Sequence, residues 1–291
     1  MLIHISNIIF PIIIIVFIGY LYALKYPSDM TVANRLTINI FVPALVFSIL
    51  ASKKIDLFEY QYLAIGAISI IFISGILAWI FAKVTRTNIK TFVPPMMYAN
   101  SGNIGLPVAL LAFGEKALPA AIILFMIENT LHFTLGIKTI DKMASIAHVL
   151  KMPMILASFL GILVSLIEFT PPKIILNPLI MIGEIAIPLM LFSLGVRLAA
   201  INWSDWKIGI IGAIFRPVFG LISLIIVLPF IHLDELNNSL LIIFAILPPA
   251  VLNFLVAEKY NQEPEKVASI VLIGNLFSLL TIPITLYFLL L

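Results

Sequence analysis

The stretch YANSGNIGLPVALL, residues 98–111, lies in the middle of an apolar run from residue 91 to residue 113. The run is long enough to cross a bilayer. Its centre contains Gly102, Gly105 and Pro107, which disfavour a continuous helix, beside the amides of Asn100 and Asn103. Backbone polar groups freed inside a membrane are tolerated only where protein or a polar cavity surrounds them. The stretch therefore predicts a helix break that lines a cavity.

The composition is typical of a polytopic membrane protein. Of the 291 residues, 62% are hydrophobic and 11% are charged, and the mean hydropathy is +1.19. These values lie far outside the range of soluble globular domains. The net charge of +3 does not come from a clustered basic face, so it does not indicate nucleic-acid binding. The chain has no cysteine, which excludes disulfides and thiolate metal sites.

Ten apolar windows of about 20 residues are separated by charged or proline-rich breaks. They lie at residues 5–24, 31–51, 60–82, 91–113, 118–137, 149–168, 178–199, 208–230, 236–257 and 267–290. The first window has span length and no basic segment before it, so we interpret it as a span and not as a cleavable signal. The connections are too short for a soluble catalytic domain, and we expect neither an enzyme nor a metal site.

Lysine and arginine residues are distributed unevenly over the connections. The connections after odd-numbered windows, with the window ends beside them, contain Lys25, Arg35, Lys83, Arg86, Lys90, Lys138, Lys142, Lys151, Arg197, Lys207, Lys259 and Lys266. The opposite side contains Lys53, Lys54, Lys116 and Lys173. Positive residues favour the cytoplasmic side of a membrane. We therefore predict a multi-pass protein of the cell membrane with both termini on the extracytoplasmic side.

The two halves of the chain match at a nearly constant offset. In chain order, the matches are Gly19 with Gly161, Val42–Ser48 (VPALVFS) with Ile187–Ser193 (IPLMLFS), and Asn129 with Asn275. Because each copy has five windows, the second copy enters the membrane from the opposite side. The sequence predicts an all-α membrane protein of ten transmembrane helices in two inverted five-helix repeats, a layout typical of transporters.

The repeat places a second helix break at Pro248–Pro249, in the ninth window. Breaks at equivalent positions of two inverted repeats are typical of transporter binding sites. Each break begins a new half-helix, at about residues 106–107 and 250–251, whose first-turn amides and positive dipole end favour an anion. The candidate substrate-binding residues lie in or beside these breaks: Asn100, Gly102, Asn103, Gly105, Pro107, Pro248, Pro249 and Asn253.

Glu128 and Arg216 lie at mid-membrane depth, where ionisable residues usually pair or mark an ion path. Three interpretations are open. The two residues form a static ion pair, or Glu128 binds a coupling H⁺ or Na⁺ beside Asn129 and Asn275, or Arg216 neutralises an anionic substrate. We interpret His132, one turn beyond Glu128, as a structural hydrogen-bonding residue.

The motifs NSGNIGLP (residues 100–107) and ILPPAVLNFLVAEKYN (residues 246–261), with the order of all ten windows, resemble the auxin efflux carrier family. That family includes plant auxin carriers and bacterial malate or malonate permeases. The resemblance implies a sodium/proton antiporter-like or bile acid symporter-like fold with crossing helices 4 and 9. It also implies that Asn100 contacts a substrate carboxylate. Asn253 stands where plant carriers have proline.

The resemblance further implies two domains. Residues 1–52 (helices 1 and 2) and 148–200 (helices 6 and 7) form a scaffold domain, through which a homodimer assembles. Residues 53–147 (helices 3–5) and 201–291 (helices 8–10) form a mobile transport domain.

We therefore expect a secondary transporter that moves a small organic anion across the lipid bilayer by elevator-type alternating access. Suitable anions are carboxylates such as malate, malonate or an auxin-like acid, and no bound cofactor is expected. The chain has no nucleotide-binding motif, which excludes direct ATP drive by this chain. The alternatives are a cation/proton antiporter or a sodium-coupled organic anion symporter of the same fold. A receptor that kept this fold would need an attached signalling domain, and the sequence contains none.

Overall fold

The computed structural model describes residues 2–26, 29–52, 58–140, 151–199 and 205–290. Within these ranges all regular elements are helices, and two unwound segments form one isolated β-bridge. The prediction of an all-α protein is therefore confirmed. Lys53, Lys54 and Lys142, which contributed to the predicted orientation, lie outside the described residues.

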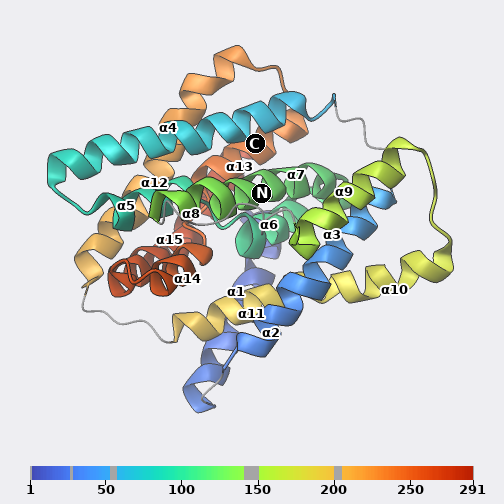
Figure 1. Cartoon of the computed structure of the whole chain (residues 1–291), viewed down its shortest axis with the longest axis horizontal. Coiled ribbons are helices and arrows are strands. Elements are labelled where there is room, and N and C mark those ends of the chain that lie inside the picture. The colour runs from blue at the N-terminus through green and yellow to red at the C-terminus, as the bar shows by residue number, and fades with distance from the viewer. Residues whose placement is uncertain (1, 27–28, 53–57, 141–150, 200–204, 291) are drawn as a thin grey trace.

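The helices follow one another without any intervening strand in the described ranges (Figure 1). The first half contains α1 (Leu2–Lys25), α2 (Thr31–Leu36), η1 (Thr37–Phe41), α3 (Val42–Ala51), α4 (Gln61–Thr85), α5 (Ile89–Met97), η2 (Ser101–Gly105), α6 (Leu106–Phe113), η3 (Glu115–Ala117), α7 (Leu118–Leu131), η4 (His132–Gly136) and α8 (Ile137–Ile140). The second half contains α9 (Pro153–Leu166), α10 (Lys173–Glu184), α11 (Ala186–Leu198), α12 (Trp206–Val227), η7 (Leu228–Phe230), α13 (Glu235–Ile246), α14 (Leu252–Lys259) and α15 (Pro264–Leu289).

Seven helical segments are long and apolar enough to cross a membrane. They are Ile5–Lys25, Thr31–Ala51, Gln61–Thr85, Glu115–Ile140, Lys173–Leu198, Trp206–Phe230 and Pro264–Leu289. Three shorter apolar helices, Ser101–Phe113, Pro153–Leu166 and Glu235–Ile246, fall in the other predicted windows. The protein is thus a multi-pass membrane protein, whereas ten crossings stay a prediction because these three helices are shorter than a bilayer span.

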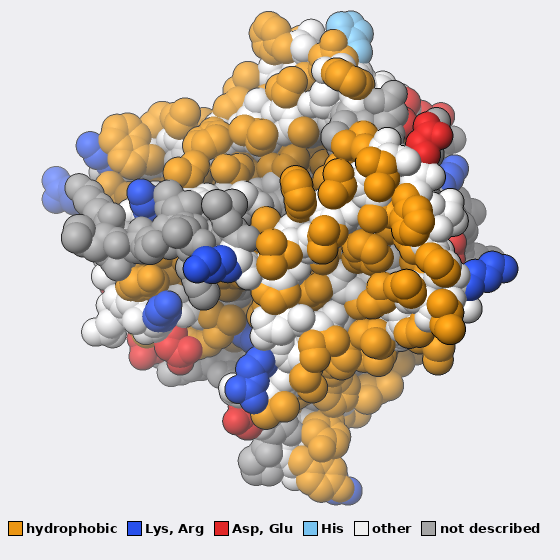
Figure 2. All heavy atoms as spheres, turned by 45° about the vertical axis from the view of Figure 1, so that its right-hand side comes forward, with side chains coloured by type: hydrophobic (Ala, Val, Ile, Leu, Met, Phe, Trp, Pro, Cys, Tyr) orange, Lys and Arg blue, Asp and Glu red, His pale blue; other side chains and the backbone are white. Residues whose placement is uncertain are grey.

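Lipid-facing character is visible on the surface. Figure 2 shows a broad apolar face, with acidic and basic side chains toward its edges. Large hydrophobic side chains are exposed on helices throughout the chain, among them Phe17, Trp79, Phe159 and Ile225. Soluble monomers rarely expose apolar surface on this scale, so the face is suited to a membrane.

The most extensive helix contacts fall into two groups (Figure 1). In the first group α1 packs on α11, and α3 packs on α9 and α10. In the second group α12 packs on α15 and α4, and α4 packs on α5. The first group comes from residues 1–52 and 148–200, and the second from residues 53–147 and 201–291. That these groups act as a scaffold and a transport domain stays a prediction.

Helices of the first group approach one another closely at glycines. A Cβ atom at Gly19 of α1 would lie 2.2 Å from the carbonyl oxygen of Phe192 in α11. A Cβ atom at Gly161 of α9 would lie 2.9 Å from the Cβ atom of Leu50 and 3.5 Å from the carbonyl oxygen of Phe47, both in α3. Small residues at such crossings are typical of membrane helix packing. The two contacts are equivalent in the internal repeat, because the sequence aligns Gly19 with Gly161 and Phe192 with Phe47.

Candidate functional site

Two helices are interrupted within the apolar part of the chain. α5 ends at Met97 and the next helical turn begins at Ser101, and α13 ends at Ile246 and α14 begins at Leu252. The first break therefore lies at residues 98–100, before Gly102 and Gly105, and the new half-helix begins at Ser101 and not at the predicted residues 106–107. The second break includes the predicted Pro248–Pro249, but its helix resumes slightly later than the predicted residues 250–251.

The side chain of Asn100 explains the earlier position of the first break. Its Oδ1 accepts a hydrogen bond from the Asn103 N–H at 3.2 Å, which is the contact of a helix N-cap. The capped helix begins as a π-helical turn, in which the Gly105 N–H donates to the Asn100 carbonyl at 3.1 Å. Pro107 follows this π-helical turn and lies at the start of α6.

The two unwound segments cross and pair with each other. Ala99 and Pro249 form an antiparallel bridge. Its two hydrogen bonds are donated by the Asn100 N–H to the Pro248 carbonyl at 2.7 Å and by the Ala250 N–H to the Tyr98 carbonyl at 2.9 Å. The freed backbone groups therefore satisfy one another, which allows both breaks to persist in an apolar environment.

Three buried asparagines reinforce this crossing. Asn100 Nδ2 donates to Asn275 Oδ1 at 2.7 Å, and Asn275 Nδ2 donates to the Pro249 carbonyl at 3.0 Å. Asn253 Nδ2 donates to the Tyr98 carbonyl at 3.2 Å. The amides thus connect α15 and α14 to both breaks without placing a fixed charge in the interior.

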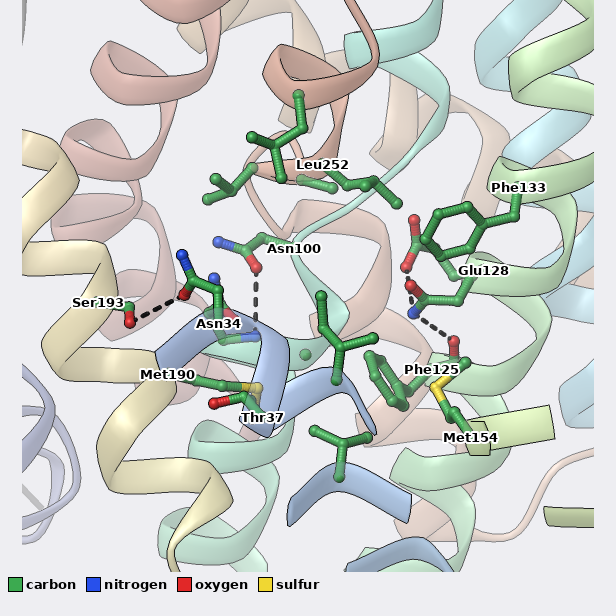
Figure 3. A pocket seen from close by; sticks show the side chains of 18 of the residues that line it. Asn34, Thr37, Asn100, Phe125, Glu128, Phe133, Met154, Met190, Ser193 and Leu252 are labelled. Atoms are coloured by element: carbon green, nitrogen blue, oxygen red, sulfur yellow. Dashed lines mark hydrogen bonds between the residues drawn. The ribbon is translucent and has the colours of Figure 1, made fainter. Parts of the chain in front are cut away.

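A cavity of about 480 Å³ opens beside the crossing (Figure 3). The crossing contributes Ala99, Asn100, Gly102, Asn103, Ala250, Val251 and Leu252 to its lining. The facing wall, from α2, η1 and α11, includes Asn34, Arg35, Thr37, Met190, Ser193 and Arg197. The first turns after both breaks therefore lie on the cavity. Several of their N–H groups already have acceptors at the breaks, since Asn103 donates to Asn100 Oδ1 and Asn253 donates to the Ala250 carbonyl.

Glu128 of α7 lines the same cavity and is 2% exposed. Its Oε2 accepts hydrogen bonds from Ser101 Oγ at 2.7 Å and from Asn129 Nδ2 at 3.1 Å. Its Oε1 lies 3.5 Å from Nδ1 of His132, whose ring stacks on Tyr98. The carboxylate thus contacts the first turn after the first break, where negative charge is stabilising.

Arg216 of α12 is fully buried, and it is not among the residues that line the cavity. Its Nη1 donates to the Ala245 carbonyl at 3.1 Å, in the last turn of α13. A cation there stabilises the negative end of the half-helix dipole. No ion pair joins Arg216 to Glu128 among the described contacts, so the first of the three open interpretations, a static ion pair, is not found there, and Arg216 instead caps α13.

The structure places only some predicted site residues on the cavity. Asn100, Gly102, Asn103, Glu128 and Asn129 line it. The remaining predicted residues do not, because they lie within or behind the crossing: Gly105, Pro107, Pro248, Pro249, Asn253, Arg216 and Asn275.

Sequence reasoning missed the facing wall. Ser193 Oγ donates to Asn34 Oδ1 at 3.1 Å, which connects α11 to α2 at the cavity. Figure 3 shows both Asn34 and Asn100 directed into this space. Ser193 is the last residue of Ile187–Ser193, the second of the two matched repeat motifs. This motif was the feature of the sequence that could have indicated the facing wall.

Comparisons with known proteins agree with this architecture. A family model described as membrane transport protein matches residues 136–286, just over half of the chain. A putative malonate transporter of Rhizobium meliloti (strain 1021) is 24% identical over 310 residues, which cover 98% of this chain and 95% of the relative. An uncharacterized transporter of Methanocaldococcus jannaschii is 24% identical over 298 residues, which cover 95% of this chain and 96% of the relative. The chain belongs to the auxin efflux carrier family of membrane transport proteins.

Proposed function

We propose that the protein is a secondary transporter that holds the carboxylate of a small organic anion at the crossing of its two broken helices. The observation that carries this proposal is a cavity lined by Asn100, Gly102 and Asn103 at the start of a helix. Helix N-termini bind anions through free N–H groups and a positive dipole end. The Asn103 side chain has no hydrogen-bond partner among the described residues and offers a further donor.

Asn100 supports this binding mode in two ways. It caps the helix and connects it to Asn275, so it fixes the orientation of the first-turn amides. One hydrogen of its Nδ2 is used by Asn275, and the second can donate to a carboxylate. Neutral donors of this kind bind an anion and release it again more easily than a buried cation would.

The position of the cavity supports alternating access of the elevator type. Its crossing wall belongs to the second helix group, and its facing wall belongs to the first. An anion held by the crossing would therefore move with one group along the surface of the other. The matched contacts of Gly19 with Phe192 and of Gly161 with Phe47 support an inverted repeat, from which two such states arise.

The relative described as a putative malonate transporter favours a carboxylate over a cation as the transported species. The cation/proton antiporter of the same fold is less well supported, because Glu128 is the only acidic residue in the described lining of the cavity. A coupled symporter is the stronger second candidate. Glu128 would repel an anionic substrate in the same cavity, and H⁺ or Na⁺ uptake at Glu128 would remove that repulsion.

Charge movement across proteoliposomes tests the proposal. Malate, malonate, succinate, lactate and indole-3-acetate are added rapidly, with and without sodium and a pH step. We expect a current for at least one acid that Asn100→Ala abolishes and that Asn177→Ala, on an exposed part of α10, leaves unchanged. Tracer uptake and binding of the same acids cover electroneutral transport.

The opposite result is equally specific. Absence of current, uptake and binding for every acid, with proton flux driven by a sodium or pH jump alone, would replace the organic anion transporter with an antiporter.

A further inference from the structure

Two arginines line the cavity on the wall that faces the crossing. Arg35 belongs to α2 and Arg197 to α11, and they are the basic residues in the described lining. Neither forms an ion pair among the described residues. A guanidinium is always charged and presents a planar set of donors that matches a carboxylate in two hydrogen bonds.

The Ser193–Asn34 hydrogen bond joins the two helices that carry these arginines. Arg35 follows Asn34 directly, and Arg197 lies one helical turn, about 5.4 Å, beyond Ser193. Arg35 is exposed and Arg197 is half-buried. The facing wall therefore presents two cations that have no ion-pair partner among the described residues, and the crossing on the other side of the cavity carries neutral donors.

The remaining lining raises the importance of these charges. Phe125, Phe133, Met154, Met190 and Leu255 give the cavity a largely apolar surface. Water competes less well for a cation in such surroundings, so a carboxylate that reaches the arginines is bound more strongly than at an open surface. An apolar ligand would gain nothing from the two arginines, so their presence in this lining favours a ligand with a negative charge.

We propose that Arg197, assisted by Arg35, binds a second carboxylate, so that the preferred substrate is a dicarboxylate whose first carboxylate lies at the crossing. The inference rests on the proposed function, because the crossing must hold the first carboxylate. A monocarboxylate uses the crossing and leaves the arginines unpaired. Arg197 and Arg35 are thus specificity-determining residues for the charge of the substrate.

Binding to purified protein in detergent, measured by calorimetry, tests the inference. Malonate, succinate and glutarate are compared with propionate, butyrate and pentanoate, which have the same numbers of carbons. We expect the protein to bind at least one diacid about 10- to 100-fold more tightly than its matched monoacid. Arg197→Gln removes this preference by weakening diacid binding about 10- to 100-fold, and it leaves monoacid binding within about twofold.

Two control variants distinguish carboxylate binding by Arg197 from general electrostatic attraction by the protein and from an effect of Glu258 on Arg197. Lys207→Gln removes a positive charge outside the cavity and should leave the preference unchanged. Glu258 is exposed on α14 and acts electrostatically on Arg197. Glu258→Gln should also leave the preference for diacids unchanged. If Arg197→Gln does not fold, as judged by thermal unfolding, Arg35→Gln provides the same comparison with a smaller expected loss.

Several results would overturn the inference. The arginine variants could weaken the binding of monoacids and diacids equally, or they could leave the preference for diacids unchanged. Glu258→Gln could also reduce this preference as much as Arg197→Gln does. Wild-type protein that binds monoacids and no diacid would overturn the inference and leave the proposed function intact. Wild-type protein that binds no acid at all would instead contradict the proposed function.

Discussion

At the scale of single residues, Asn100 connects the fold to the site. One side chain caps a helix through Oδ1 and donates through Nδ2 to Asn275, and its backbone N–H pairs with the second break. An aspartate could accept at the cap but could not donate to Asn275, and it would repel an anion. The position therefore needs an amide, and its loss affects the geometry of the crossing as well as the binding of a substrate.

Glu128 provides the prediction at this scale. Its carboxylate lies on the cavity and is 2% exposed, so its negative charge opposes an anionic substrate held there. Glu128→Gln removes this charge and keeps the shape of the side chain, so we expect the variant to bind the substrate about tenfold more tightly than the wild type. Calorimetric titration of both proteins with the same acid measures the change, and an equal or lower affinity of Glu128→Gln would contradict this role.

Other titratable and charged groups face Glu128 and need controls. His132 contacts it, Tyr98 stacks on His132, and Arg35 and Arg197 line the same cavity. Arg216 acts on Glu128 electrostatically from α12. We expect His132→Gln, which leaves the Glu128 carboxylate in place, to bind the substrate with wild-type affinity. An equal gain in affinity in His132→Gln would show that the effect does not come from the charge of Glu128. A sodium dependence of wild-type binding that Glu128→Gln removes would assign Na⁺ to this carboxylate.

The sequence predicts residues of the site well when they are local to the broken motifs. Asn100 and Asn103 stand out because amides next to helix breakers are unusual in an apolar run, and Glu128 stands out by its depth. Arg35 and Arg197 have a conventional explanation as cytoplasmic positive charges, which conceals their place on the cavity. The depth of Arg216 was predictable, but its partner is a carbonyl, and backbone partners leave no trace in sequence.

At the scale of elements, the two breaks are stable because they meet. A single unwound segment would leave several backbone groups without partners, whereas two antiparallel segments satisfy one another. Helix breakers predict that a helix ends, but the residue at which it ends depends on which side chain caps the next helix. For this reason the existence of both breaks was predictable and the exact limits of the first were not.

The crossing of α1 and α11 gives the prediction at this scale. A Cβ atom at Gly195 would lie 1.9 Å from the carbonyl oxygen of Val16, and a backbone atom cannot rotate away. We expect Gly195→Ala to separate the helices and lower the stability by about 1–3 kcal/mol. Gly66→Ala is the matched control, because its nearest neighbour is a terminal methyl of Leu241 that can move. Equal apparent melting temperatures of the two variants in detergent would contradict this role of Gly195.

At the scale of the whole molecule, the two helix groups meet at the cavity. The crossing connects segments from both halves of the chain within the second group. The first group is held by its own glycine contacts between α1 and α11 and between α3 and α9. The division of the helices into these two groups agrees with the division that the family resemblance implies. The shape of the space between them could not be predicted, because it depends on how side chains from distant segments pack.

Alternating access can be tested directly, because the chain contains no cysteine and needs no background substitutions. Asn103 lies on the crossing wall and lines the cavity, so Asn103→Cys reports which side of the membrane can reach the site. We expect a membrane-impermeant maleimide to modify this cysteine from either side of oriented proteoliposomes, with the labelling rate on each side changed by substrate. Lys207→Cys and Lys116→Cys, on the predicted cytoplasmic and extracytoplasmic sides, should each be labelled from one side only. Labelling of Asn103→Cys from a single side under all substrate conditions would show that the crossing does not change its access, and the two helix groups would then form a fixed channel wall or a static receptor.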